Sequence, residues 1–348
     1  MLLVGDIGGT NTRLALYSSD DERPRSILAK NYSSRKNDSL MQIVKQFLKH
    51  IDSEKHGITV DQAVFGVAGP IDREKGECSI TNLPWIVKVS EMQTLLKINA
   101  VHLLNDVESI AYGVPYLTDD DVRQLNRSEE AQGENRKGNK VLIAPGTGLG
   151  EAILLYDELD KNYHISATEG GHADFAPRNQ FEMGLLRYLH DKFWESSYGH
   201  ISYERVISGR GIEHIYDYLR ETYSIAENPD VAEKLKKAAH DERASIISKA
   251  AQKHLSELCM TTLTTFVSIL GAEAGNMTLK TLAYGGVYLG GGIPQKIVDK
   301  LQDGSFMAAF ANKGRFSGTM LKIPVYVIMK DEPGLFGAAC YAKFHRGV

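Results

Sequence analysis

The stretch LLVGDIGGTNTRLALY, residues 2–17, consists of an apolar run, a turn with two glycines and a second apolar run. Apolar runs of this length predict two β-strands, and the glycines predict a tight turn between them. The pattern recurs far along the chain in KVLIAPGTGLGEAILLY, residues 140–156. The two copies align from their glycines onward, which indicates a long-range duplication of one strand–turn–strand unit. We therefore expect two related α/β halves that face a cleft.

The segments around these hairpins alternate between strand and helix patterns. Apolar periodicity predicts a helix at 38–50, strands at 63–69 and 101–106, a helix start at 108–112, a long helix at 251–272, a strand at 281–294 ending in three glycines, and a helix of small residues within 331–342. One stretch breaks the pattern. Residues 119–140 are rich in Asp, Glu, Asn, Arg and Gly, which predicts an exposed insertion.

Composition excludes several classes of protein. The 348 residues are 43% hydrophobic and 24% charged, enough for two domains with packed cores. The net charge of -4 offers no basic excess for nucleic acid. Cys78, Cys259 and Cys340 are too few for a disulfide framework or a four-cysteine zinc site, so a reducing compartment is expected. No signal-peptide pattern and no uncharged run of membrane-spanning length are visible, which favours the cytoplasm.

Glycine-rich turns at strand ends are suited to binding a polyphosphate. Glycine has no Cβ and tolerates positive φ, so its backbone N–H groups can form a concavity around an anion. For one turn alone, an ordinary tight hairpin is the simpler interpretation. Two such turns and a third glycine cluster together favour nucleotide binding. The candidate residues are Gly8, Gly9, Thr10, Asn11, Gly146, Thr147, Gly148, Gly290, Gly291 and Gly292.

Other nucleotide-binding folds lack their signatures in this sequence. No G-x-x-x-x-G-K-[ST] stretch occurs, which excludes a P-loop enzyme. Glu151 and Gln295 stand where the third glycine of G-x-G-x-x-G would be, so a Rossmann dinucleotide site has no support. The glycine loop, H-R-D and D-F-G set of protein kinases is also absent.

Six segments resemble the bacterial-type glucokinase family of the hexokinase, actin and sugar-kinase superfamily, and the resemblance spans nearly the whole chain. DIGGTNTR (6–13) and PGTGLG (145–150) resemble the two phosphate motifs, and GGVYLGGGIP (285–294) resembles the adenosine motif. LND (104–106) resembles the sugar-binding and catalytic motif. EGGHADFAP (169–177) and SYERVISG (202–209) resemble the two further sugar-contact segments.

This resemblance implies an α/β two-domain actin-like ATPase (ribonuclease H-like) fold with an interdomain cleft. The small domain would comprise residues 1–115 and 332–348, and the large domain residues 116–331. The domains are expected to close over glucose and ATP with Mg²⁺, and to transfer the γ-phosphoryl group of ATP to the 6-hydroxyl of glucose. We expect glucose and ATP as partners, no nucleic acid or membrane, and a homodimer in the cytoplasm.

The sequence departs from the related group of repressor, open-reading-frame and kinase sugar kinases. Those proteins carry a cysteine-rich zinc motif shortly after the sugar-binding histidine. This chain has no cysteine between Cys78 and Cys259, which favours the zinc-free glucokinase branch.

Asp106 is the candidate catalytic residue. It lies at the predicted carboxyl end of a strand, where α/β sites gather. The resemblance implies that it is the general base that accepts the proton of the attacking sugar hydroxyl. The alternative is that Asp106 only caps the following helix. On the residues alone the two interpretations are equal, and the motif favours catalysis.

The resemblance implies that the sugar contacts are Asn105, Glu169, His172 and Glu204, together with Asp106. Carboxylates, an amide and an imidazole suit a hexose, whose hydroxyls both donate and accept. Two glycines between Glu169 and His172 would let the backbone approach a ligand closely. Taken singly, His172 could be structural and Glu204 a solvated surface residue.

Asp6 is the candidate magnesium residue, holding the ion through water, as the resemblance implies. The alternative is that its carboxylate satisfies the amides of the adjoining turn. The glycines of the third cluster would let adenosine approach the backbone.

Three other functions stay open as alternatives. The first is a kinase for another hexose, such as mannose, fructose or glucosamine. The second is a catalytically silent sugar-binding regulator, which the presence of Asp106 disfavours. The third is an actin-like or chaperone-like ATPase, which would have no use for the sugar-contact segments at 169–172 and 202–209.

Overall fold

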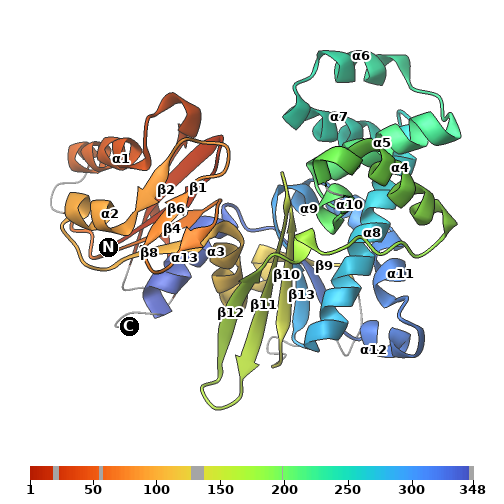
Figure 1. Cartoon of the computed structure of the whole chain (residues 1–348). Helices are drawn as coiled ribbons and strands as arrows, with labels where there is room; N and C mark the ends of the chain where they lie inside the picture. The colour runs from red at the N-terminus through yellow and green to blue at the C-terminus, as the bar shows by residue number, and fades with distance from the viewer. Residues whose placement is uncertain (19–22, 55–57, 127–136, 198, 345–348) are drawn as a thin grey trace. The chain divides into compact units, whose positions relative to one another are not determined.

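The computed structural model describes residues 1–18, 23–54, 58–126, 137–197 and 199–344. The chain divides into two compact units, residues 1–120 with 330–348 (unit 1) and residues 121–329 (unit 2). In Figure 1 the blue end of the chain accordingly lies with the red and orange N-terminal elements. The predicted boundaries, near Pro115 and Asp331, fall within a few residues of these limits.

Unit 1 contains the strands β1 (Leu2–Ile7), β2 (Asn11–Tyr17), β3 (Ser26–Ser33), β4 (Gln62–Val67), β5 (Ile71–Asp72), β6 (Glu77–Ser79), β7 (Ile86–Lys88) and β8 (Val101–Asn105), and the helices α1 (Leu40–Glu54), α2 (Val89–Leu96), α3 (Asp106–Gly113) and α13 (Pro333–Phe344). Its main sheet has the order β3-β2-β1-β4-β8. β1 pairs antiparallel with β2 across the glycine turn and parallel with β4, which pairs parallel with β8. The first hairpin is therefore confirmed.

The central strands β1 and β4 are buried on both faces of this sheet, because they alternate apolar side chains between two helix layers, whereas the edge strand β3 is partly exposed. Leu3 and Ile7 of β1 pack into a core with the apolar face of α1, which confirms the helix predicted at 38–50. Leu2 and Val4 of the same strand pack instead with α13. The glycine turn thus projects from a strand that is fixed from both sides.

Helix α13 packs closely on α3 because glycines stand at the contact. A Cβ on Gly337 would collide with the carbonyl oxygen of Ser109 and would lie 3.0 Å from the amide nitrogen of Gly113. The Ser109 hydroxyl also donates to the carbonyl oxygen of Gly334 at 2.8 Å. The beginning of α13 is thereby fixed next to β1, where a Cβ on Gly334 would lie 3.6 Å from Cγ of Asp6.

We expect Gly337→Ala to lower the free energy of unfolding by about 1–3 kcal/mol, because the added methyl group must displace the backbone of α3. The matched control is Gly318→Ala in α12 (Ser317–Met320), where no atom lies within 4 Å of the Cβ position. Alanine there should be neutral or stabilising by roughly 0.5–1 kcal/mol. Thermal unfolding followed by circular dichroism gives both values, and an unchanged Tm for Gly337→Ala would contradict this account of the packing.

Unit 2 contains the strands β9 (Val122–Gln124), β10 (Lys140–Pro145), β11 (Leu149–Asp157), β12 (Asn162–Thr168), β13 (Gly286–Leu289) and β14 (Val325–Ile328), and the helices α4 (Gln180–Ser197), α5 (Gly209–Tyr223), α6 (Pro229–Lys237), α7 (His240–Gln252), α8 (Glu257–Thr281), α9 (Gly292–Lys296), α10 (Val298–Leu301), α11 (Ser305–Ala311) and α12. Its sheet has the order β12-β11-β10-β13-β14-β9. The first five strands repeat the order and the directions of the unit 1 sheet, which confirms the duplication predicted from the two hairpins.

Helix α8 is the core helix of unit 2 and lies beside the strands β10 and β13 (Figure 1). Among the described residues it is the one helix that is long and apolar enough to cross a membrane by length and composition. However, 72% of its apolar 18-residue window is buried inside the protein. Such burial is typical of the central helix of a packed domain.

The long helix predicted at 251–272 is confirmed from residue 257 onward as α8, but its beginning is wrong, because a second helix ends within this stretch. α7 ends at Gln252 and α8 begins at Glu257. Between them His254 adopts a φ of 54°, and Ser256 caps α8 by accepting a hydrogen bond from the amide of Cys259 at 3.3 Å. Leu255, which lies between the two helices, is 52% exposed.

The exposed insertion predicted at 119–140 is also partly wrong. Its beginning contributes β9, which pairs antiparallel with β14 at the edge of the unit 2 sheet. The Asn126 side chain accepts a hydrogen bond from the amide of Val325 at 3.0 Å and donates to the carbonyl of Ile323 at 2.7 Å. The rest of this prediction concerns residues 127–136, which lie outside the described residues. The sequence analysis missed this strand because it is polar, and because the strand with which it pairs, β14, is distant in the sequence.

Candidate functional site

The first glycine turn joins β1 to β2 and is closed by a hydrogen bond from the amide of Gly8 to the carbonyl of Asn11 at 3.0 Å. Ser34 braces it from the end of β3. The Ser34 hydroxyl donates to the carbonyl of Gly8 at 2.8 Å, and its amide donates to the carbonyl of Thr10 at 2.9 Å. Ser34 is fully buried. Sequence reasoning missed this residue because no local pattern connects it to the turn.

The second glycine turn joins β10 to β11 and is closed in a similar way. The amide of Gly146 donates to the carbonyl of Gly148 at 2.8 Å, and the amide of Gly209 donates to the carbonyl of Gly146 at 2.9 Å. Oε2 of Glu204 accepts a hydrogen bond from the amide of Leu149 at 3.0 Å. A predicted sugar contact is therefore held directly against a predicted phosphate turn.

Both turns leave two consecutive amides for a ligand. The N–H groups of Gly9 and Thr10 in the first turn, and of Thr147 and Gly148 in the second, donate to no acceptor among the described residues. Both threonines are exposed. Adjacent unsatisfied amides in a turn form an anion-binding concavity, so this geometry is what a phosphate group requires.

The third glycine cluster lies against the second turn because β10 and β13 are parallel neighbours whose carboxyl ends meet. The amide of Gly290 donates to the carbonyl of Ile143 at 2.8 Å. Gly291 has a φ of 78°, and a Cβ on it would lie 2.6 Å from the carbonyl oxygen of Pro145. Only glycine fits this position. Gly292 is exposed and begins α9.

Asn105, and not Asp106, caps helix α3. Oδ1 of Asn105 accepts hydrogen bonds from the amides of Val107 at 2.9 Å and Glu108 at 3.3 Å, and Oε2 of Glu108 accepts from the amide of Asn105 at 3.2 Å. Glu108 is buried, and the Arg73 guanidinium contacts both of its carboxylate oxygens at 3.2 Å. The alternative role of Asp106 as the helix cap therefore belongs to its neighbour.

This capping box orients both predicted residues of the LND motif. Because Oδ1 of Asn105 is committed to the helix, its Nδ2 is the group that can donate to a ligand. Asp106 is the first residue of α3 and is half-buried at the carboxyl end of β8. Its Oδ1 accepts a hydrogen bond from the amide of Val107 at 3.0 Å. Sequence reasoning missed Glu108, although a Glu three residues after Asn is the signature of a capping box.

Glu169 precedes the short 3-10 helix η5 (Gly170–His172), His172 is its last residue, and both are exposed. The two intervening glycines approach protein atoms, which corrects the expectation that they approach a ligand. A Cβ on Gly170 would collide with the carboxylate of Glu151, and one on Gly171 would collide with the carbonyl of Leu149. These contacts press η5 against β11.

The segments that carry Glu169 and Glu204 are joined to each other. An isolated bridge pairs Asp174 with Ser202, and the amide of Tyr203 donates to the carbonyl of Ala173 at 2.9 Å. Unit 2 therefore gathers its predicted residues, from the second turn, the third cluster and both sugar segments, around one end of its sheet. Unit 1 likewise gathers the first turn, Asn105 and Asp106 at the carboxyl ends of its parallel strands.

Asp6 lies near the end of β1, beside the first turn. Its side chain is 31% exposed, and Oδ2 lies 3.4 Å from Nη1 of Arg13, whose Nε lies 3.7 Å from Oε1 of Glu332. Burial raises the pKa of Asp6, and the Arg13 charge opposes this shift. No hydrogen bond from the turn amides to this carboxylate occurs in the described part of the chain, contrary to the alternative role. A partly exposed carboxylate with one long contact fits Mg²⁺, which keeps several waters.

This chain is similar to known proteins over nearly its whole length. The sequence model of the glucokinase family matches residues 3–345. A curated glucokinase of Nostoc punctiforme is 39% identical, with 99% of each chain covered. The solved glucokinase of an Antarctic psychrotroph has a TM-score of 0.80 and 30% identity, with 97% of each chain covered.

The chain belongs to the glucokinase family. The predicted family is thus confirmed, and so is the two-domain actin-like ATPase fold. A more distant structure, a ROK family glucokinase from Streptomyces griseus in complex with glucose and AMPPNP, has a TM-score of 0.62 at 17% identity and covers 97% of each chain. At that identity the likeness shows the fold alone.

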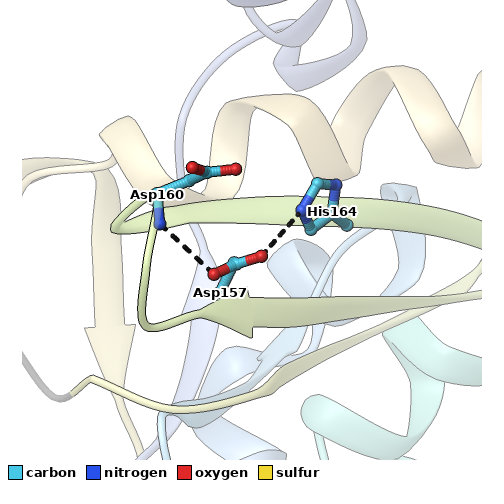
Figure 2. A group of neighbouring side chains, drawn as sticks. All are labelled: Asp157, Asp160 and His164. Atoms are coloured by element: carbon cyan, nitrogen blue, oxygen red, sulfur yellow. Dashed lines mark hydrogen bonds and ion pairs between the residues drawn. The ribbon is translucent and has the colours of Figure 1, made fainter.

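One further polar cluster of this glucokinase family member lies away from the glycine turns. Figure 2 shows Asp157, Asp160 and His164 at the tip of the β11–β12 hairpin. Oδ1 of Asp157 accepts hydrogen bonds from the amides of Leu159 at 2.7 Å and Asp160 at 3.2 Å, and these bonds lower the pKa of Asp157. Oδ2 lies 3.4 Å from Nε2 of His164. The cluster therefore stabilises a turn, and we assign no ligand to it.

Proposed function

We propose that this protein is a glucokinase, which transfers the γ-phosphoryl group of ATP to the 6-hydroxyl of glucose and yields glucose 6-phosphate and ADP. The observation that carries the proposal is the capping of α3 by Asn105. The neighbouring Asp106 is the first residue of α3 and lies half-buried at the carboxyl end of β8. The full-length match to the glucokinase family supports the same reaction.

We assign the phosphate chain of ATP to the amides of Gly9 and Thr10 in one turn and of Thr147 and Gly148 in the other. Asn11 and the other glycines of these turns shape the backbone. The cluster Gly290–Gly292 is assigned to adenosine, because its last residue, Gly292, is exposed and has no atom within 4 Å of its Cβ position. Phosphoryl transfer depends on positioning and on stabilising negative charge, and preorganised amides supply both.

We assign Mg²⁺ to the carboxylate of Asp6, through water. The bound ion would neutralise charge that develops on the phosphate oxygens. The guanidinium of Arg13 lies beside this carboxylate and holds the Asp6 side chain in place. We assign its positive charge, too, to the phosphate oxygens.

We assign the sugar to Asn105, Glu169, His172 and Glu204. Nδ2 of Asn105 donates to a sugar hydroxyl, and the carboxylates accept from others. Glu204 uses Oε2 for the amide of Leu149, so Oε1 is the oxygen that can accept from the sugar. A site that hydrogen-bonds each hydroxyl discriminates strongly against sugars that lack one, because its polar groups would be left unpaired.

In the proposed reaction Asp106 accepts the proton of the 6-hydroxyl as its oxygen attacks the γ-phosphorus. The bond between that phosphorus and the bridging oxygen of ATP breaks, and ADP leaves. The proposal assigns residues of both units to one reaction.

A hexose panel tests the proposal. ATP-dependent phosphorylation of glucose, mannose, fructose and glucosamine is measured with Mg²⁺, by following ADP. We expect the highest kcat/KM for glucose and loss of activity when EDTA removes the metal. Preference for another hexose would change the substrate assignment. Glucose binding without turnover of any hexose would favour a silent regulator instead.

We also propose a homodimer in a reducing cytoplasm. Cys78, Cys259 and Cys340 are all buried and free, which suits a compartment without disulfide formation. Light scattering of the purified protein measures the assembly, and a mass of one chain would contradict the dimer.

A further inference from the structure

The buried carboxyl of Glu151 lies beneath the first sugar-contact segment, residues 169–177, which is called the sugar segment below. Glu151 has no role in the reaction proposed above. Glu151 is on β11, is 2% exposed and pairs with Thr168, the last residue of β12 before Glu169. One of its oxygens, Oε2, fills the space that a side chain on Gly170 would need. The carboxyl of Glu151 therefore forms the support on which the first residue of η5 rests.

A second buried carboxylate, Glu273, anchors the other sugar segment. Glu273 is on α8 and is 1% exposed. Its Oε2 accepts a hydrogen bond from Nδ2 of Asn276 at 2.9 Å. The same amide lies 3.0 Å from the Tyr203 hydroxyl, and Lys313 donates to Oδ1 of Asn276 at 2.6 Å. Tyr203 directly precedes Glu204.

The two carboxyl groups differ in how they are compensated. Glu273 accepts a hydrogen bond from Nδ2 of Asn276 and has the charge of Lys313 nearby. Oε1 of Glu151 is buried and has no hydrogen-bond partner among the described residues. Burying an ionised carboxylate without a hydrogen-bond partner costs much more free energy than burying the uncharged acid. The charged groups that act on Glu151 are Glu273 and the exposed Lys280, both on α8. Burial, and to a smaller extent the charge of Glu273, raises the pKa of Glu151 to about 8, and the charge of Lys280 opposes this shift.

We propose that Glu151 is a positioning residue for the sugar segment: its uncharged carboxyl supports Gly170 and so sets the positions of Glu169 and His172, and its ionisation displaces them. This proposal depends on the proposed function in one respect, namely that the sugar segment binds the sugar. The sign follows from the raised pKa. The support is complete at neutral and acidic pH, and it is lost as the pH rises through about 8.

The first test compares Glu151→Gln with the wild type in KM for glucose between pH 6 and 9.5. The amide has the shape of the acid and stays uncharged throughout. We expect wild-type KM to rise by about fivefold or more above pH 8 with a smaller change in kcat, because substrate binding is what is lost. In Glu151→Gln this rise should be absent. The matched control is Glu213→Gln, which removes a largely buried carboxylate paired with Arg243 at 2.7 Å and should keep the wild-type profile.

The second test needs no substrate. Amide hydrogen exchange of peptides covering residues 165–175, corrected for the intrinsic effect of pH, is measured at pH 7 and 9. We expect excess exchange at pH 9 in the wild type and in Glu213→Gln, but not in Glu151→Gln. If Glu151→Gln does not fold, the exchange of the wild type alone tests the proposal. Its excess exchange should then be confined to residues 165–175 and should have its midpoint near pH 8.

Equal pH dependence of KM and exchange in Glu151→Gln and the wild type would overturn the proposal. Excess exchange spread evenly over unit 2 would do the same. The proposed function fails separately, if the wild type phosphorylates no hexose. In that case the exchange measurement still decides whether Glu151 positions the segment.

Discussion

Asp106→Asn will reduce kcat for glucose phosphorylation by about 10²- to 10⁴-fold, the usual contribution of a general base. The amide has nearly the size of the carboxylate but cannot accept the proton of the 6-hydroxyl. Helix α3 should persist, because Asn105 and Glu108 form its capping box. Glucose should still bind, with an affinity within a few-fold of the wild type by calorimetry. The loss should therefore appear in kcat, which steady-state kinetics separates from KM.

The chain offers a matched control for this variant. In α6, Asn228 caps the helix by accepting from the amides of Asp230 and Val231, and the exposed Asp230 stands in the first turn. Asp230→Asn removes the same kind of charge from the same kind of helix end, where the interaction with the helix dipole is worth about 0.3–1 kcal/mol. Its kcat should equal that of the wild type. If Asp106→Asn also retains turnover within a few-fold, the assignment of the base is wrong.

The second large effect is expected for Glu204→Ala, with kcat/KM for glucose reduced by about 10- to 100-fold, the equivalent of losing a hydrogen bond to a charged group. Two contacts go together. Oε1 no longer accepts from the sugar, and the amide of Leu149 loses its 3.0 Å partner. Because Leu149 follows the second glycine turn, and a Cβ on Gly148 would lie 2.5 Å from Oε2 of Glu204, KM for ATP should rise as well.

Glu204→Gln separates these two contacts. Its side-chain oxygen can still accept from the amide of Leu149, so KM for ATP should stay close to the wild type. Discrimination among hexoses should weaken, because the charged acceptor for the sugar is gone. Steady-state kinetics with each substrate varied in turn measures both constants. A Glu204→Ala variant with both KM values within threefold of the wild type would contradict the assignment of this residue to the sugar.

Local patterns predicted the elements that depend on neighbouring residues. The hairpin at residues 2–17 and its copy at 140–156 form as expected, because apolar runs and glycine turns act within a few residues of each other. The helix α1 likewise follows from one apolar stripe. The same local logic failed at Ser256, where a cap separates two helices whose apolar residues read as one stripe.

The candidate site could be predicted from sequence only as a set of residues. Motifs indicated Asp106 and the glycine turns, but local sequence did not tell which side chain caps α3. The pairing of Asn105 with Glu108 decides this, and the role of Asp106 toward a ligand stays a prediction. The glycines between Glu169 and His172 were interpreted as space for a ligand. The structure shows that the space is taken by β11.

By itself the sequence determined the two duplicated hairpins with their glycine turns, and it predicted the candidate residues for phosphoryl transfer. The tertiary structure alone decided which distant groups support them: Ser34 behind the first turn, Glu204 against the second, and the buried carboxyl of Glu151 beneath Gly170. The physical reason is that turns and amphipathic faces arise from interactions over a few residues. Buried hydrogen bonds and close contacts instead depend on which strands become neighbours, and packing of the whole chain determines that.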